Sequence, residues 1–190
     1  MRRSLLTGLF FVTTLLVGPA AADVIVVDIN GGGDFTELDL AITVAQPGDT
    51  VLVKPGNYFG PFNPFGEALI IDKALTVVGD VGGPPLVPVT YIQNLDPGET
   101  VIIRNISFID SPTAGLNTPP LNIRDNLGTI ALEDCIFRGE ESFFFGTDFN
   151  QTAMVVEDSV GVSATRCVIT AGKGFDSDPD VIFPPTETAD

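Results

Sequence analysis

The segment Val101-Ile102-Ile103-Arg104-Asn105-Ile106-Ser107-Phe108 decides the fold, because the chain repeats its pattern. Residues 130–137 and 162–169 carry apolar or small residues at the same first, third, sixth and eighth positions, with a polar break at the fourth and fifth. Two fainter copies begin at Val51 and Leu75. One strand-like unit that recurs at a spacing of roughly 20 to 50 residues indicates a stacked repeat architecture.

The sequence between the copies supports the same architecture. After Asp49, short apolar stretches alternate with Gly, Pro, Asn and Asp, which is typical of strands joined by turns. Two or three strands per repeat predict an all-β fold, a parallel β-helix in which each turn pairs with the turns before and after it. A two-sheet sandwich is the competing fold, but it would not need the same apolar columns to recur. We expect one β-helix domain over residues 23–172.

The N-terminus has the pattern of a secretory signal peptide. Arg2 and Arg3 precede an apolar run over residues 5–17, and Ala20-Ala21-Ala22 fits a cleavage site. We therefore predict a signal peptide over residues 1–22 and a protein that is secreted, or held at the cell surface or in the periplasm. An uncleaved membrane anchor is the alternative, although the run is short for a membrane span. No later segment is apolar enough to span a membrane.

A short helix is expected before the repeats. Phe35, Leu38, Ala41, Ile42 and Ala45 follow helical spacing, with Thr36 as the N-cap and Pro47-Gly48 as the stop. The first turn of a repeat stack exposes apolar side chains and unpaired backbone. We therefore predict that residues 36–45 form an N-terminal capping helix.

Composition excludes several functions. The 190 residues carry a net charge of −16, which disfavours binding to nucleic acid or to anionic lipid. An acidic polysaccharide would also be repelled unless a cation such as calcium lay between the two. The chain has no His, which removes Ser-His and Cys-His catalysis and the usual zinc sites.

The two cysteines, Cys135 and Cys167, fall in the same column of successive repeats. Side chains in one column lie about 5 Å apart along the stack. We expect two stacked free thiols. A Cys135–Cys167 disulfide is the alternative, for which the geometry between turns is often poor.

Two stretches near the N-terminus carry a resemblance to a known family. They are Asp34-Phe35-Thr36-Glu37-Leu38-Asp39-Leu40-Ala41-Ile42 and Pro47-Gly48-Asp49-Thr50-Val51-Leu52-Val53-Lys54-Pro55-Gly56-Asn57-Tyr58. Together they resemble the opening of right-handed parallel β-helix proteins of the pectinesterase and pectate-lyase type. The resemblance covers the N-terminal coils and implies a right-handed helix. It implies little about activity, because many functions share one fold.

Two residues match the pectinesterase pattern further along the chain. Gln151, sixteen residues before Cys167, takes the place of a Gln that helps to stabilise an oxyanion in that family, and Asp176 loosely takes the place of a general acid/base. In the family the nucleophilic Asp and the Arg that orients it lie further along. Without a nucleophile the resemblance does not yield a working mechanism, so we predict that these 190 residues are not a complete enzyme.

Two further clusters, one aromatic and one acidic, contain candidate binding residues. Phe143, Phe144 and Phe145 lie in a long loop, either as an exposed carbohydrate-binding patch or folded back over a sheet. Residues 173–190 are predicted to be either an acidic, Pro-rich C-terminal tail or the start of a continuation of the chain. Within them, Asp176, Asp178 and Asp180 occupy alternate positions. Such a run either binds calcium or is solvated.

Taken together, these features predict a secreted acidic β-helix module that presents a surface to an extracellular partner, most simply a polysaccharide. One alternative is the N-terminal portion of a polysaccharide-active esterase or lyase. Another is a structural surface or adhesion module with no small ligand.

Overall fold

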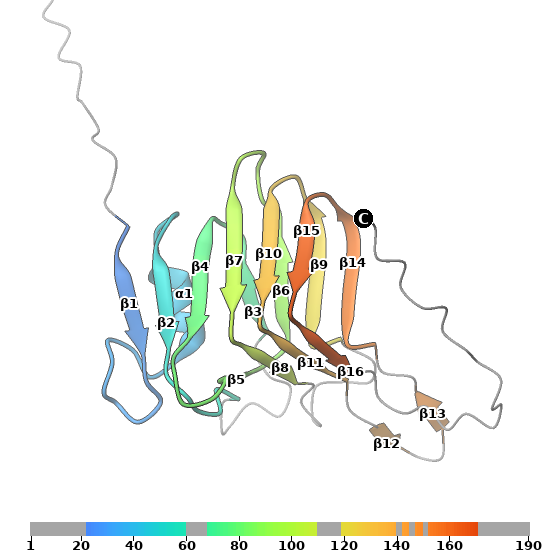
Figure 1. Ribbon diagram of the computed structural model, residues 1–190, viewed down its shortest axis with the longest axis horizontal. Coiled ribbons are helices and arrows are strands. Elements are labelled where there is room, and N and C mark those ends of the chain that lie inside the picture. The colour runs from blue at the N-terminus through green and yellow to red at the C-terminus, as the bar shows by residue number, and fades with distance from the viewer. Residues whose placement is uncertain are drawn as a thin grey trace, which may run out of the picture.

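The computed structural model describes residues 22–59, 68–109, 119–139, 142–144, 147–149 and 152–170. In this part of the chain the strands wind into a β-solenoid of about four turns (Figure 1). Every pair of neighbouring strands within its three sheets is parallel. The predicted parallel β-helix is therefore confirmed, and the sandwich is excluded. The predicted signal peptide, apart from Ala22, and the predicted tail lie outside the described residues.

Three sheets run along the solenoid, and we name them A, B and C. Sheet A contains β1 (Val24–Val27), β2 (Thr50–Val53), β4 (Leu75–Gly79), β7 (Thr100–Arg104), β10 (Thr129–Glu133) and β15 (Val162–Thr165). Sheet B contains β5 (Leu86–Val87), β8 (Ser107–Ile109), β11 (Ile136–Arg138) and β16 (Val168–Thr170). Sheet C contains β3 (Leu69–Ile71), β6 (Thr90–Gln93), β9 (Leu121–Asn126) and β14 (Met154–Ser159). In the later turns the chain visits sheets A, B and C in that order.

The register in sheet A confirms most of the predicted columns. Ile130 of β10 lies beside Val101 of β7 and Val162 of β15. The copy at Val51 was misplaced relative to the copy at Leu75, because Val51 lies beside Val77 and not beside Leu75. Since side chains alternate with a period of two, a slip of two residues leaves the same faces pointing inward, and the apolar pattern alone cannot detect it.

The polar break in each repeat forms the corner between sheets A and B. Asn105, Asp134 and Arg166 occupy equivalent corner positions with φ of 53°, 54° and 54°. Left-handed backbone of this kind is most readily adopted by Gly, Asn and Asp. This conformation turns the chain within the two residues that separate the strands, so that the next strand starts a new sheet.

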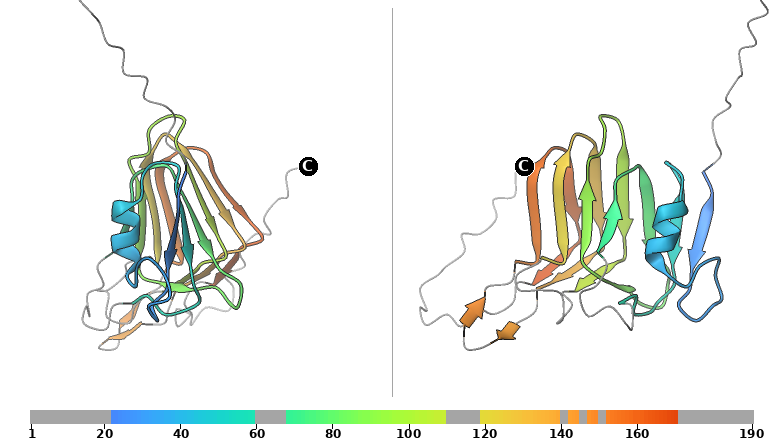
Figure 2. Two further views of the ribbon diagram at one scale, coloured as in Figure 1. Left: turned by 90° about the vertical axis from the view of Figure 1, so that its left-hand side faces the viewer. Right: turned by 180° about the vertical axis from the view of Figure 1, so that it is seen from behind.

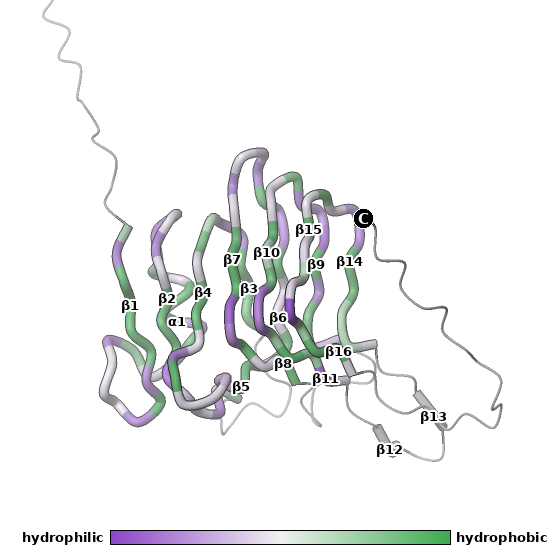
Figure 3. Tube along the Cα trace, viewed as in Figure 1, coloured by the Kyte–Doolittle hydropathy of each residue, from purple (hydrophilic) through white to green (hydrophobic). Residues whose placement is uncertain are grey.

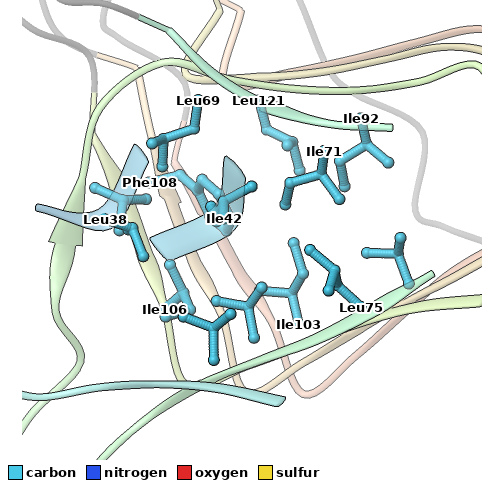
Figure 4. Close-up of a cluster of buried hydrophobic side chains, with 14 of the residues drawn as sticks. Leu38, Ile42, Leu69, Ile71, Leu75, Ile92, Ile103, Ile106, Phe108 and Leu121 are labelled. Atoms are coloured by element: carbon cyan, nitrogen blue, oxygen red, sulfur yellow. The ribbon is translucent and has the colours of Figure 1, made fainter. Parts of the chain in front are cut away.

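The inward columns of the three sheets form one core. In Figure 4, Leu75 and Ile103 of sheet A point toward Ile71, Ile92 and Leu121 of sheet C. Sheet B contributes Phe108 and Phe137, whose rings stack with centroids 5.1 Å apart. Repetition of like side chains along each column therefore fills the interior.

The single helix of the described residues, α1, spans Leu38–Val44. It is shorter than predicted, and Glu37 instead of Thr36 precedes it, because Glu37 still has an extended backbone (φ −112°, ψ 127°) just after Phe35, which forms a bridge to Val27. Its place in the chain, between two strands of sheet A, is where later turns form a strand of sheet C.

The helix has the predicted capping role. It buries Leu38, Ala41 and Ile42 against the core next to β3, the first strand of sheet C (Figure 2). Lys73 then donates from Nζ to the carbonyls of Thr43 and Ala45, which satisfies acceptors at the helix C-terminus.

The outer edge of β1 is closed by the loop that follows it. The Asp34 carboxylate accepts from Val26 N–H at 2.8 Å, and Asp34 N–H donates to the Val26 carbonyl at 2.7 Å. This close approach requires glycine at position 33, because a Cβ there would lie 2.5 Å from the Val26 oxygen. The loop thus occupies backbone groups that would otherwise be free to pair with another strand.

A buried carboxylate connects the start of β1 to the turn after α1. Asp49 is 5% exposed and accepts from Asp23 N–H at 2.9 Å and from Gln46 N–H at 2.7 Å. These two donors lower the pKa of the Asp49 carboxyl from its ordinary value, and the charge of Lys73 contributes in the same direction. The ionised carboxylate therefore stabilises the N-terminal end of the solenoid.

Candidate functional site

Two long connections of the solenoid leave from the corner between sheets B and C. Residues 110–120 connect β8 to β9, and residues 139–153 connect β11 to β14, whereas two residues connect β9 to β10 and β14 to β15. In repeat proteins, insertions that gather on one face often form the binding face. This corner and the neighbouring sheets are therefore the first place to look for a site.

One of these connections contains a small hairpin. β12 (Ser142–Phe144) pairs with β13 (Thr147–Phe149) in antiparallel fashion, with Phe143 opposite Asp148. Figure 2 shows this hairpin projecting from the side of the solenoid where the long connections leave. The candidate residues Phe143 and Phe144 lie in β12, and Phe145 lies outside the described residues.

The outer face of sheet C, next to this corner, carries an aromatic and polar cluster. Because Ile92 and Ile123 point into the core, Tyr91 and Arg124 point outward from neighbouring turns. The Arg124 guanidinium carbon lies 4.6 Å from the centre of the Tyr91 ring, a cation–π contact. Both side chains are partly exposed.

The register adds two polar residues to this pair. Gln93, Arg124 and Glu157 form one outward column across β6, β9 and β14. We call Tyr91, Gln93, Arg124 and Glu157 the sheet C cluster. It combines an aromatic ring with hydrogen-bond donors and acceptors on one face of the sheet, which is suited to a ligand with both CH faces and hydroxyl groups.

Asn122 lies in the same face but has a structural role. Its side chain is 6% exposed, and its Nδ2 donates to the Pro119 carbonyl at 2.7 Å. This hydrogen bond fixes the point where the connection of residues 110–120 returns to the sheet. The cluster is therefore held next to a loop whose end is anchored.

Sequence reasoning missed the sheet C cluster because its members come together only through the register of β6, β9 and β14. A signal was present in the sequence. Near the end of each strand, an apolar residue is followed by a polar residue and then by Asn or Asp, as in Ile92-Gln93-Asn94, Ile123-Arg124-Asp125 and Val156-Glu157-Asp158. The third residue has positive φ in all three turns, at 60°, 54° and 43°.

The structure does not describe the catalytic and metal candidates. Gln151, Asp176, Asp178 and Asp180 are all outside the described residues, so their predicted roles remain predictions. Among the residues that the structure does describe, no group of three or more His, Cys, Asp or Glu side chains is arranged to hold a metal ion.

The cysteines are free thiols, and one of them is deeply buried. Cys135 has no exposed surface, and its Sγ donates to the Glu133 carbonyl at 3.3 Å. Burial raises the pKa of the Cys135 thiol to about 12, so this side chain is a poor nucleophile at neutral pH. Cys167, in the last turn, is partly exposed.

Charged pairs between turns occupy the outer face of sheet A and its corner with sheet B. Arg104 Nε donates to Glu133 at 2.8 Å, and Arg166 donates to Asp134 through two bonds of 2.7 Å. The bond from Arg166 lowers the pKa of the Asp134 carboxyl. Figure 3 shows these positions as hydrophilic ends of β7, β10 and β15. Since each charge has a partner in the adjacent turn, we assign them to the stability of the stack.

Within the described ranges, no helix has the length and apolar character needed to cross a membrane. Comparisons with protein-family models, with curated proteins and with solved structures found no match to this chain.

Proposed function

We propose that the protein is an extracellular module that binds carbohydrate on the outer face of sheet C, without a complete catalytic site. The observation that supports this proposal is the contact between Tyr91 and Arg124, with Gln93 and Glu157 in register beside Arg124. The extracellular location follows from the signal-peptide pattern of residues 1–22.

The chemistry of the sheet C cluster suits a sugar. An aromatic ring buries the CH face of a pyranose, while a guanidinium, an amide and a carboxylate bind its hydroxyl groups. The outward column of Gln93, Arg124 and Glu157 repeats once per turn, so an extended chain laid across the turns would meet one polar side chain at each step of about 4.8 Å.

The net charge narrows the ligand class. At −16, the protein repels polyuronates unless calcium bridges them. We therefore favour a neutral polysaccharide, and calcium is an additional requirement only for an acidic one.

Binding of neutral oligosaccharides, measured by calorimetry after a glycan-array survey, tests the proposal. Arg124→Ala and Tyr91→Ala should each weaken binding by about tenfold, which corresponds to about 1.4 kcal/mol. Arg104→Ala is the matched control, because it removes the same charge from a charge-paired site on sheet A. Absence of binding by the unmodified protein, or equal affinity of Arg124→Ala and Arg104→Ala, would contradict the proposal.

The resemblance of residues 34–58 to pectinesterases and pectate lyases favours a second candidate, part of a right-handed β-helix enzyme that acts on polysaccharide. Two residues of that stretch have structural roles here: Asp34 closes the edge of β1, and Tyr58 donates from its hydroxyl to the Lys54 carbonyl at 2.9 Å. The resemblance therefore supports a shared structure of the first turn better than it supports a shared catalytic activity. Release of methanol or of an unsaturated product from pectin would favour the enzyme, whereas no activity and no glycan binding would favour an adhesion module.

A further inference from the structure

The Tyr91 ring has two faces, and one of them is already covered. The Arg124 guanidinium carbon lies over that face, 4.6 Å from the ring centre. Arg124 belongs to β9, the strand of the following turn, so the other face of the ring points away from β9 and toward β3 of the preceding turn. A sugar that stacks on Tyr91 therefore approaches from the side of β3.

The residue that β3 places beside Tyr91 is apolar and exposed. Ile70 is the register partner of Tyr91. It is 50% exposed, whereas Leu69 and Ile71 on either side of it point into the core and are 4% and 2% exposed. Ile70 and Tyr91 together form an apolar strip across two turns on the outer face of sheet C.

The polar column of the sheet C cluster also reaches this turn. Asp72 directly follows β3, and the register that pairs Ile71 with Ile92 places Asp72 beside Gln93. Asp72 is exposed. An apolar pair and a polar pair therefore lie side by side, with about 4.8 Å between the turns and about 7 Å along the strands. This patch has roughly the size of one pyranose ring.

The same column is interrupted on the side of β9. There the register partner of Tyr91 is Asn122, which is 6% exposed and donates to the Pro119 carbonyl at 2.7 Å. The next outward residue of the column is Val155 of β14. Asn122 thus separates Tyr91 from Val155, whereas Ile70 adjoins Tyr91 directly.

We propose that the main sugar subsite lies over β3 and β6, and that Ile70 and Asp72 bind the ligand together with the sheet C cluster. This inference rests on the function proposed above. The CH face of one pyranose ring packs on Tyr91 and Ile70.

The polar pair beside this strip defines the ligand class. The Asp72 carboxylate accepts a hydrogen bond from one sugar hydroxyl, and the Gln93 amide binds the neighbouring hydroxyl. A carboxylate at this position repels the carboxylate of a uronate. The ligand is therefore a neutral hexopyranose unit with two adjacent free hydroxyl groups.

Titration calorimetry with cellotetraose and mannotetraose, and with any neutral glycan that the array survey adds, tests the proposal. Asp72→Asn removes a charged acceptor and should weaken binding by about five- to tenfold. Ile70→Ala removes part of the apolar strip and should weaken binding by about threefold.

Each variant has a matched control. Asp96→Asn alters an exposed carboxylate in the turn after β6, and Val155→Ala shortens a partly exposed side chain at the other end of the Ile70 column. Both should change the affinity by less than about twofold. Nuclear Overhauser effects provide a second measurement, because the CH protons of the bound sugar should contact the Ile70 methyl groups and not those of Val155.

The outcomes separate this subsite from the proposed function. Binding that Tyr91→Ala weakens, but that Asp72→Asn and Ile70→Ala change no more than their controls do, would overturn the subsite and leave the proposed function standing. Overhauser contacts to Val155 instead of Ile70 would have the same meaning. Absence of binding by the unmodified protein would contradict the proposed function and the subsite with it.

Discussion

The first and last turns of the solenoid end in different ways. At the N-terminal end, helix α1 covers the first strand of sheet C, and Asp34 occupies both backbone groups of Val26 on the outer edge of β1. At the other end, the described part of the last turn exposes Val156 and Ile169 from the inward columns. The repeats alone therefore supply the core of a solenoid, and its ends need separate sequence elements.

The largest expected effect separates the middle of the solenoid from its last turn. Phe137→Ala removes a fully buried ring from its stack on Phe108 and should lower the free energy of unfolding by about 3–5 kcal/mol. Ile169→Ala changes the next residue of the same column, where the side chain is half exposed, and should cost less than about 1 kcal/mol. Chemical denaturation measures both, and equal losses would contradict the difference between the two turns.

A smaller loss is expected from opening the N-terminal edge. Gly33→Ala brings a Cβ within 2.5 Å of the Val26 carbonyl oxygen, so the loop must move away from β1. We expect a loss of about 1–3 kcal/mol in unfolding free energy. Asp34→Asn keeps an acceptor for Val26 N–H and should cost less. Thermal unfolding combined with exchange of the Val26 amide checks both variants, and unchanged exchange in Gly33→Ala would show that the loop does not close the edge.

The N-terminal end should also depend on pH. The folded pKa of Asp49 lies below its ordinary value of 3.8, so its stabilising contribution is present above that value and is lost as the pH falls through the folded pKa. Asp49→Asn should therefore be less stable than the unmodified protein at pH 6, and the difference should shrink below pH 3.8. Thermal midpoints over this range measure it. Asp134→Asn removes the carboxylate from the exposed pair with Arg166 and should lower the thermal midpoint at pH 6 by less than Asp49→Asn does. A larger loss in Asp134→Asn would contradict the stabilising role assigned to Asp49.

The smallest expected effect is a difference in the rate at which the two thiols are alkylated. Cys135 is buried and its pKa is raised to about 12, so it should resist alkylation while the protein is folded. Cys167, in the more exposed last turn, should react first. Mass spectrometry of the peptides after timed treatment with iodoacetamide measures the order, and faster labelling of Cys135 would contradict the burial.

The regular part of the fold was predictable from the sequence, but its irregular parts were not. The columns that begin at Val101, Ile130 and Val162 were predicted correctly because their apolar patterns are strong. The copy at Val51 was misplaced by two residues, a slip that preserves the inward face. The short strand β5 was missed because prolines surround Leu86–Val87.

The candidate site depended on information that the sequence pattern does not carry. Tyr91 and Arg124 meet only when β6 and β9 are in register, and the lengths of the connections between them vary. The edge-closing role of Asp34 likewise depends on backbone contacts with Val26. Composition and the signal-peptide pattern led to the class of function that we propose, but they could not predict that the candidate site lies on the outer face of sheet C.

Cross-strand nuclear Overhauser effects around Ala131 test the central claim most directly. The account predicts that β10 lies between β7 and β15, with Ala131 beside Ile102 on one side and beside Ser163 on the other. Contacts should advance in the same direction along all three strands, as parallel pairing requires. Contacts that run in opposite directions, or β7 and β15 that do not both adjoin β10, would contradict the solenoid.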